Sequence, residues 1–296
     1  MHDLVGVLLG LMAALVWGTT DVVATLASRS VGSLAATAGM VLTSVVTLAL
    51  LVLVTGTRLP EDPSVAVTAL ASGAISALAY LAFFTALRHG PITVVSPVVS
   101  LYGGLTVVLS ILLLGEQLAR LQAVGVVVAT CGVVLAAVAF DQGIRSARPI
   151  GPGVAYALIA LVAFAAVTIL LSGPIRAAGW LPIMLLSRIA NASVGWVILG
   201  ATRVVRRRAV AASPRRRFDR RAAGLVVAAG LLDTAAFVAF AVGLQVSETW
   251  LVGITSSFGP VVAVAFGVLM FDERPRRIQW LGLVFVAASV FLIALG

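Results

Sequence analysis

A long stretch of the sequence occurs twice, and this repeat constrains the fold more than any other feature. The segment 100–125 is apolar as far as Gly115-Glu116 and then ends in Gln-x-x-Gly, and the segment 257–282 has the same design. A shift of 157 residues, the distance from Ser100 to Ser257, also aligns Glu116 with Glu273, Gln122 with Gln279 and Gly125 with Gly282. Self-similarity of this length indicates one folding unit present in two copies.

The apolar character of the repeat extends over the whole chain. Of the 296 residues, 61% are hydrophobic and only 10% are charged, with a mean hydropathy of +1.16, whereas soluble domains carry about 25% charged residues. A membrane span needs about 20 apolar residues, and lipid-exposed open sheets are not viable. We therefore predict an all-α integral membrane protein with ten spanning helices, at 4–27, 33–54, 65–87, 92–114, 119–139, 151–171, 181–202, 222–243, 248–271 and 277–295.

Each copy of the repeat then contains five spans. The first would occupy residues 1–140 and the second residues 151–296. Because five is odd, the second copy enters the membrane from the opposite face. Inverted repeats of this kind are typical of transporters, which bind their substrate near the bilayer midplane between the halves. We expect two inverted five-helix repeats around a central cavity.

Three stretches resemble the EamA-type transporters of the drug/metabolite transporter superfamily. They are AALVWGTTDVVA in the first span, residues 82–135 with the Glu and Gln-x-x-Gly ending, and residues 240–295. The resemblance covers nearly the whole chain and implies ten helices in two inverted repeats that move small metabolites or drugs across the cell membrane. One departure is that the second copy has Phe164 where the first has the Trp-Gly pair.

The basic residues are unevenly distributed among the expected loops. All 20 are arginines; 16 follow odd-numbered spans, three follow even-numbered spans, and Arg188 lies inside a span. Positive loops favour the cytoplasm, so this bias predicts both termini outside, whereas the family resemblance implies cytoplasmic termini. The arginine-rich loop 203–221 has this topological explanation, so we expect no nucleic-acid partner.

Three ionisable residues lie inside expected spans, where a charge costs at least about 2.5–3.5 kcal/mol near the centre. Asp21 is either a proton- or amine-binding group in the cavity or an interfacial carboxylate. Asp233 lies in mid-span, and its counterpart in the repeat is Ser76. Arg188 cannot lose its charge and needs a partner. Antiparallel spans would place Arg188 and Asp233 about 4.5 Å apart along the membrane normal, so we predict that they pair, with a substrate carboxylate or a proton competing for the pair.

Other polar residues divide into scaffold and cavity candidates. Glu116 and Glu273 end repeated spans and are expected to cap turns and to pair with the adjacent loop arginines Arg120 and Arg274. Hydroxyls near the prolines of the fourth and ninth spans could line the cavity or could instead serve helix packing. Aromatic rings could supply walls for an apolar or cationic substrate. These hydroxyl and aromatic candidates are Trp17, Tyr80, Ser96, Tyr102 and Ser256.

The function class follows from these features. The sequence has no phosphate-binding loop for ATP, no His/Cys cluster for a metal and no hydrolase triad, so we expect no cofactor and no catalytic residue. We predict a secondary transporter, an exporter of small metabolites or drug-like compounds that uses alternating access, with protons as a possible coupling ion. The alternatives are a channel-like facilitator or lipid flippase on the same scaffold, and a membrane-embedded enzyme. Its functional unit would be a monomer or a homodimer.

Overall fold

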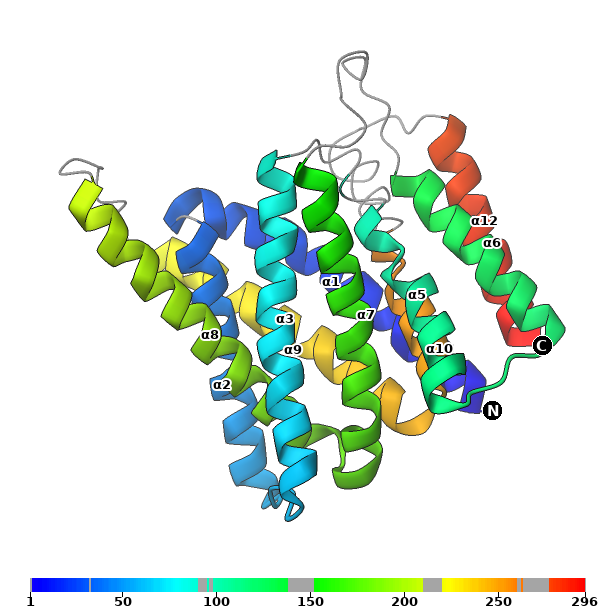
Figure 1. Cartoon of the computed structure of the whole chain (residues 1–296), viewed down its shortest axis with the longest axis horizontal. Helices are drawn as coiled ribbons and strands as arrows, with labels where there is room; N and C mark the ends of the chain where they lie inside the picture. The colour runs from blue at the N-terminus through cyan, green and yellow to red at the C-terminus, as the bar shows by residue number, and fades with distance from the viewer. Residues whose placement is uncertain are drawn as a thin grey trace.

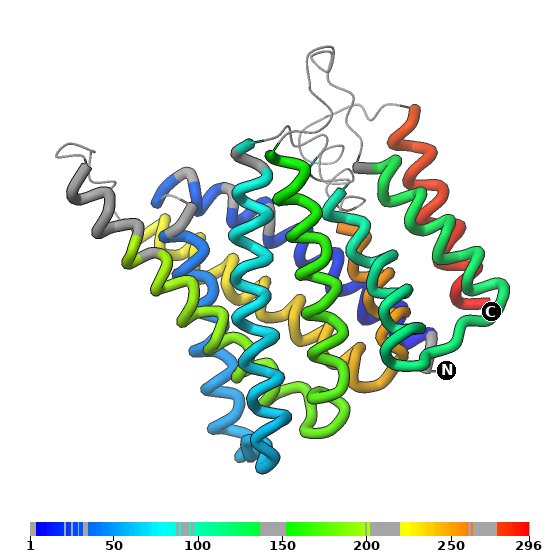
Figure 2. The backbone as a smooth tube through the Cα atoms, viewed as in Figure 1, coloured from blue at the N-terminus to red at the C-terminus, as the bar shows by residue number. Residues whose placement is uncertain are grey.

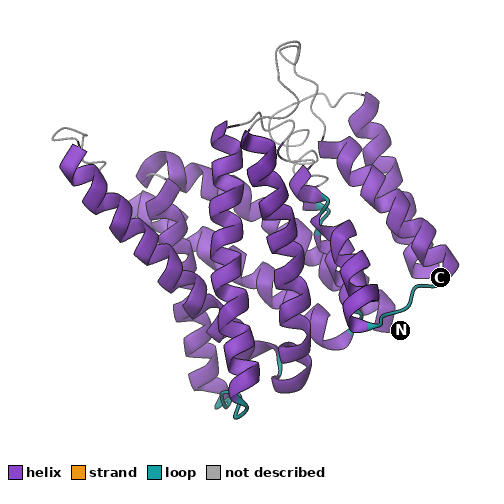
Figure 3. Ribbon diagram, in the orientation of Figure 1, coloured by secondary structure: helices purple, strands orange, loops and turns teal. Residues whose placement is uncertain are grey.

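The computed structural model describes residues 2–31, 33–89, 95, 98–137, 152–209, 220–259, 262 and 277–295, and every regular element in these ranges is helical (Figures 1 and 3). The helices, labelled as in Figure 1, are α1 (His2–Val31), α2 (Ser33–Thr55), α3 (Pro63–His89), α5 (Tyr102–Leu109), η1 (Ser110–Leu114), α6 (Arg120–Ala137), α7 (Pro152–Ala178), α8 (Trp180–Ala209), α9 (Arg220–Val246), α10 (Thr249–Ser256) and α12 (Arg277–Leu295).

Seven helices in the described ranges are long and apolar enough to cross a membrane, namely α1, α2, α3, α7, α8, α9 and α12. They coincide with seven of the expected spans. The fourth and fifth expected spans correspond to shorter apolar helices at 98–114 and 120–136. From the ninth expected span the structure describes residues 248–259, which include α10, and residue 262. The protein is therefore an all-helical, multi-pass membrane protein.

The start of α3 shows how the sequence sets a helix boundary between two spans. Asp62 precedes Pro63, and its Oδ1 accepts the backbone N–H of Ser64 at 2.8 Å. An acidic N-cap followed by proline at the first helical position is a favoured helix start. The bonds from the side chain and backbone of Ser64 hold the pKa of this exposed carboxyl below its ordinary value.

The helices of the two sequence halves pack against each other rather than forming separate bundles. α1 lies along α9, and α7 lies along α3, in two antiparallel pairs (Figures 1 and 2). The other extensive contacts join α2 to α8 and α9, α3 to α8, α10 to α1 and α5, and α6 to α12. Each of these contacts joins an element of the first half to an element of the second.

Small residues bring helix backbones into contact at matching places in the two halves. A Cβ on Gly73 of α3 would overlap the carbonyl oxygen of Ser187 in α8. A Cβ on Gly230, which the 157-residue shift aligns with Gly73, would lie 2.8 Å from the carbonyl oxygen of Met40 in α2. Close approach through glycine is a common basis of helix association in membranes. The same device therefore docks α3 on α8 and α9 on α2.

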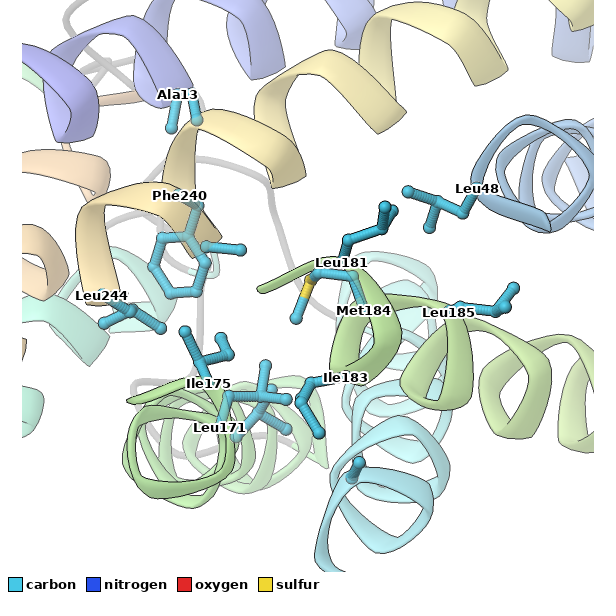
Figure 4. Close-up of a cluster of buried hydrophobic side chains, with 14 of the residues drawn as sticks. Ala13, Leu48, Leu171, Ile175, Leu181, Ile183, Met184, Leu185, Phe240 and Leu244 are labelled. Atoms are coloured by element: carbon cyan, nitrogen blue, oxygen red, sulfur yellow. The ribbon is translucent and has the colours of Figure 1, made fainter. Parts of the chain in front are cut away.

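The largest apolar core lies among α7, α8 and α9. Figure 4 shows Leu171 and Ile175 of α7 pointing toward Phe240 and Leu244 of α9, with Met184 of α8 beside them. All of these side chains are buried. This core fixes α8 and α9, which carry the two buried charges, relative to one another.

Candidate functional site

The buried charges Arg188 of α8 and Asp233 of α9 form an ion pair. An Nη2–Oδ2 hydrogen bond of 2.7 Å joins them, and the two residues are only 3% and 7% exposed. The pairing predicted from helix geometry is therefore present. The guanidinium also lies over the ring of Phe237, 3.6 Å from its centroid. Its Nε is buried and has no hydrogen-bond partner among the described residues.

Trp17 of α1 contacts the same phenylalanine, Phe237. Its ring meets that of Phe237 edge-on at 4.9 Å and that of Phe240 at 5.6 Å. The indole Nε1 is buried and has no hydrogen-bond partner. The α1–α8–α9 cluster, defined as Trp17, Arg188, Asp233, Phe237 and Phe240, thus combines an aromatic wall, one ion pair and two unused N–H donors.

A second aromatic cluster joins α3, α5 and α7. Phe164 of α7 meets Tyr80 edge-on at 5.2 Å and Tyr102 at 6.1 Å. The hydroxyl of Tyr102 lies 3.3 Å from Oγ of Ser256, which is buried in α10. Three predicted site residues, Tyr80, Tyr102 and Ser256, therefore belong to one contiguous α3–α5–α7–α10 cluster.

The two clusters are related by the sequence repeat. The 157-residue shift aligns Tyr80 with Phe237 and Ser76 with Asp233. Ser76 accepts a hydrogen bond from Nδ2 of Asn191 in α8 at 3.1 Å, so both members of this second pair contact the same helix. Trp17 and Phe164 each cover one member of the Tyr80–Phe237 pair. Both clusters thus contain an aromatic pair and a polar contact to α8. Only in the α1–α8–α9 cluster, among the described residues, is that polar contact an ion pair.

Sequence reasoning missed Phe237, Asn191 and the aromatic role of Phe164. The repeat register could have found Phe237, since it aligns with the candidate Tyr80. Asn191 lies one helical turn after Arg188, on the same face. Phe164 was noted only as a departure from the Trp-Gly pair, although its position opposite Tyr80 parallels that of Trp17 opposite Phe237.

Glu116 has a different partner from the one that the sequence suggested. We expected Arg120, which follows it closely in the chain. The structure instead gives an ion pair with Arg176 at the end of α7, 3.0 Å from Nη2 to Oε1. The carboxylate also accepts the backbone N–H groups of Thr249 at 2.9 Å and Trp250 at 3.0 Å. Glu116 therefore caps the first turn of α10 in the other half of the chain.

The surroundings of Glu116 decide its ionisation. Burial by itself raises the pKa of the carboxyl, but the hydrogen bonds from Thr249, Trp250 and Arg176 outweigh burial and hold the pKa below its ordinary value of 4.5. The residue lies in the turn between η1 and α6, outside the spanning helices. These hydrogen bonds therefore stabilise the ionised form of the Glu116 carboxyl.

Some predicted residues cannot be placed. Ser96 and Glu273 lie outside the described residues, as do Pro97 and Pro260. Asp21 lies within α1, but its side chain is outside the description. The side chains that the structure does describe contain no group of three or more His, Cys, Asp or Glu residues that could hold a metal ion.

A separate apolar groove of about 330 Å³ lies on the outer side of α9, between α1 and α2. The hydroxyls of its two threonines, Thr47 and Thr234, donate to carbonyl oxygens of their own helices. The groove therefore offers mainly apolar contacts, and its two side-chain hydroxyls have no free donor. The residues that line it are Leu9, Met12, Thr47, Leu51, Leu231, Thr234, Ala235, Val238, Ala239 and Val242.

Comparison with known families decides the classification. The model of the EamA-like transporter family matches residues 4–138 and again residues 151–295. The chain belongs to the EamA-like transporter family. Its family match is double, one match for each copy of the sequence repeat, and the two together cover nearly the whole chain. The members of this family are membrane transporters. The two aromatic clusters are therefore interpreted below as parts of a membrane transporter.

A solved crystal structure shares the fold of this EamA-like chain. It superposes with a TM-score of 0.80 at 20% sequence identity, covering 98% of this chain and 96% of the other. At this identity the likeness concerns the fold alone. No curated protein matches the sequence.

Proposed function

We propose that the protein is a secondary transporter of the cell membrane that exports small metabolites or drug-like compounds by alternating access. The observation that carries this proposal is the buried ion pair of Arg188 and Asp233 inside spanning helices. Ionisable groups at such positions are costly and mark substrate or ion pathways by default. A transporter family supplies the function class, and the α1–α8–α9 cluster supplies the chemistry.

The packing supports two inverted five-helix repeats. If α1 to α3 correspond to α7 to α9, then the pairing of α1 with α9 has its counterpart in the pairing of α7 with α3. The glycine contacts exchange in the same way, because Gly73 meets α8 and Gly230 meets α2. Such exchange is what a pseudo-two-fold axis between the halves would produce. Transporters with inverted repeats bind their substrates at that interface.

Substrate recognition is assigned to the two aromatic clusters. Arg188 Nε and Trp17 Nε1 are both buried without a hydrogen-bond partner among the described residues, so each could donate to an acceptor group of a substrate. Phe237, Tyr80 and Phe164 supply ring faces and edges for the rest of the molecule. A proton on Asp233 would release Arg188 from its partner. In this way Asp233 could couple transport to a proton gradient, and Asp21 remains a second candidate for that role.

A growth screen tests the proposal. Cells that express the wild type, Asp233→Asn or the matched control Thr234→Val are grown with toxic concentrations of amino acids, amines and drugs. Thr234 is as buried as Asp233 and adjacent to it in α9, so its substitution controls for a change at this depth. We expect wild type and Thr234→Val to give resistance to at least one compound and Asp233→Asn to lose it.

The same cells distinguish a coupled transporter from a facilitator or flippase. Collapse of the proton gradient should remove the resistance if transport is proton-coupled, and should leave it unchanged if the protein only equilibrates its substrate. If all three strains show the same resistance to every compound, the transport role of the ion pair is wrong.

A further inference from the structure

The contact between Glu116 and Arg176 joins four segments at one end of the molecule. Glu116 follows η1 and Arg176 lies in the last turn of α7. The other acceptors of Arg176 lie in the last turn of α9, in the link that follows it and at the start of α10. These helix ends lie together at the lower end of the molecule in Figure 1. The contact therefore links the last turn of a span in the first half to three helix ends in the second half.

The guanidinium of Arg176 and the carboxylate of Glu116 each make several hydrogen bonds in this contact. Nη2 of Arg176 reaches Glu116 Oε1, the carbonyl oxygen of Ser247 and Oγ1 of Thr249, each at 3.0 Å, while Nε donates to the carbonyl oxygen of Leu244 at 3.3 Å. Both carboxylate oxygens of Glu116 accept backbone N–H groups of α10. Charge-assisted bonds of this kind are about twice as strong as neutral ones.

The chain approaches Glu116 through a short irregular turn. The last five residues of the fourth span, Ser110–Leu114, form the π-helix η1, and Gly115 follows with a positive φ of 69°. The Glu116 N–H closes this turn on the carbonyl oxygen of Ser110 at 3.3 Å. Single-turn π-helices are rare and are frequently found at functional sites. Gly115 permits the left-handed conformation that turns Glu116 back toward α10.

The same end of the molecule is packed shut. All eight residues of α10 are buried. A Cβ on Gly253 of α10 would lie 3.0 Å from Cβ of Thr106, one helical turn before Ser110. The aromatic residues Trp17, Tyr80, Tyr102 and Phe237, farther along the helices, are only partly buried. A molecule bound at those rings could leave through this end only if α5 separated from α10.

We propose that Glu116 and Arg176 form a latch that holds this end of the transport pathway closed and opens once in each cycle. The proposal rests on the alternating-access function proposed above. In the closed state the latch ties η1 to the ends of α7 and α10. Release of Glu116 from Arg176 and from the first turn of α10 lets α5 part from α10. Removal of the latch therefore shifts the population toward the state that is open at this end.

The test uses cysteine accessibility and needs no substrate. The native Cys131 is exposed on α6 and is replaced by alanine. Ser110→Cys, at a position that is 0% exposed beside the latch, reports on the closed end. Ala160→Cys, at a 0% exposed position toward the other end of α7, reports on the rest of the molecule. Both reporters are labelled with a water-soluble maleimide in nanodiscs, where both membrane faces are open to the reagent.

We expect Glu116→Gln and Arg176→Gln each to raise the labelling rate of Ser110→Cys by about tenfold or more, the effect of losing one charge-assisted hydrogen bond. The double substitution should add little to the larger single effect, because both residues act through one contact. Labelling of Ala160→Cys should stay constant or fall. Arg120→Gln, which removes a nearby exposed charge outside the latch, is the matched control and should change neither rate.

Two outcomes would overturn the latch. One is an unchanged Ser110→Cys rate in both latch variants. The other is an equal rise at both reporters, which would mean that the pair only stabilises the fold. A rise with Arg120→Gln as large as with Arg176→Gln would also contradict it, because the effect would then follow from loop charge. None of these results bears on whether the protein transports, which the growth screen decides separately.

Discussion

At the scale of single residues, the buried pair of Arg188 and Asp233 is held by contacts that offset only part of the cost of burying two charges. One hydrogen bond joins the two, and Phe237 covers the guanidinium. Within the described part of the chain, Arg188 Nε has no hydrogen-bond partner. A purely structural ion pair would be expected to have all of its buried donors hydrogen-bonded. Replacing a buried ion pair by apolar groups is often neutral or stabilising. A pair retained in this state fits a functional role better than a stabilising one.

This argument predicts the outcome of a double-mutant cycle. Asp233→Leu and Arg188→Met alone should each destabilise the protein by about 3 kcal/mol or more, because each leaves one buried charge unpaired. The double substitution should cost much less than their sum and still abolish transport. Thermal unfolding in detergent measures the first effect. Additive costs would show that the two side chains do not depend on each other.

Glu116 gives a prediction for pH. Its pKa is lower in the folded protein than the ordinary value of 4.5, so the unfolded chain binds the proton more readily. The carboxylate therefore contributes stability above the unfolded pKa, and this contribution is lost as pH falls through the folded pKa. The melting temperature of the wild type should exceed that of Glu116→Gln at pH 7, with the gap closing as pH falls below 4.5. A gap that does not change with pH would contradict the assignment.

At the scale of elements, the sequence predicted positions well and distant partners poorly. Apolar length gave the seven long helices because lipid leaves few other structures for such segments. The Arg188–Asp233 pair followed from the depth of two residues on consecutive antiparallel helices. The partner of Glu116 did not follow, because Arg176 is 60 residues away and Arg120 is adjacent. Packing between non-consecutive helices leaves little signal in local sequence, apart from the glycines that the repeat aligns.

Those glycines give a prediction for α9. A methyl group on Gly230 would lie 2.6 Å from Cβ of Thr43 and 2.8 Å from the carbonyl oxygen of Met40, so α2 and α9 would have to separate. Gly230→Ala should lower stability by about 1–3 kcal/mol, as overpacking does. Gly224→Ala in the same helix meets nothing within 4 Å and should be neutral or slightly stabilising, since alanine favours helix. Equal melting temperatures for the two variants would contradict the close contact.

At the scale of the whole molecule, the resemblance of three stretches predicted the family, and apolar composition predicted an all-helical membrane protein, whereas the orientation stays a prediction. The family model matches both copies, and the helices of the two halves interlock. The arginine distribution predicts that both termini lie outside, because 16 arginines follow odd-numbered expected spans and positive loops stay in the cytoplasm. Alkaline phosphatase fused to the C-terminus should therefore be active. Fluorescence from a C-terminal green fluorescent protein fusion, with an inactive phosphatase fusion, would reverse the orientation.

The central claim is that the chain moves a small molecule across the membrane through the site built on Arg188 and Asp233. Proteoliposomes loaded with a defined mixture of amino acids, polyamines, nucleobases and cationic dyes test it most directly, with loss of each compound followed by mass spectrometry. We expect at least one compound to leave faster than from protein-free liposomes, with Asp233→Asn slowing its loss about tenfold, a change of about 1.4 kcal/mol in the barrier. Thr234→Val should match the wild type. Equal loss from wild-type, Asp233→Asn and protein-free liposomes for every compound would contradict the account.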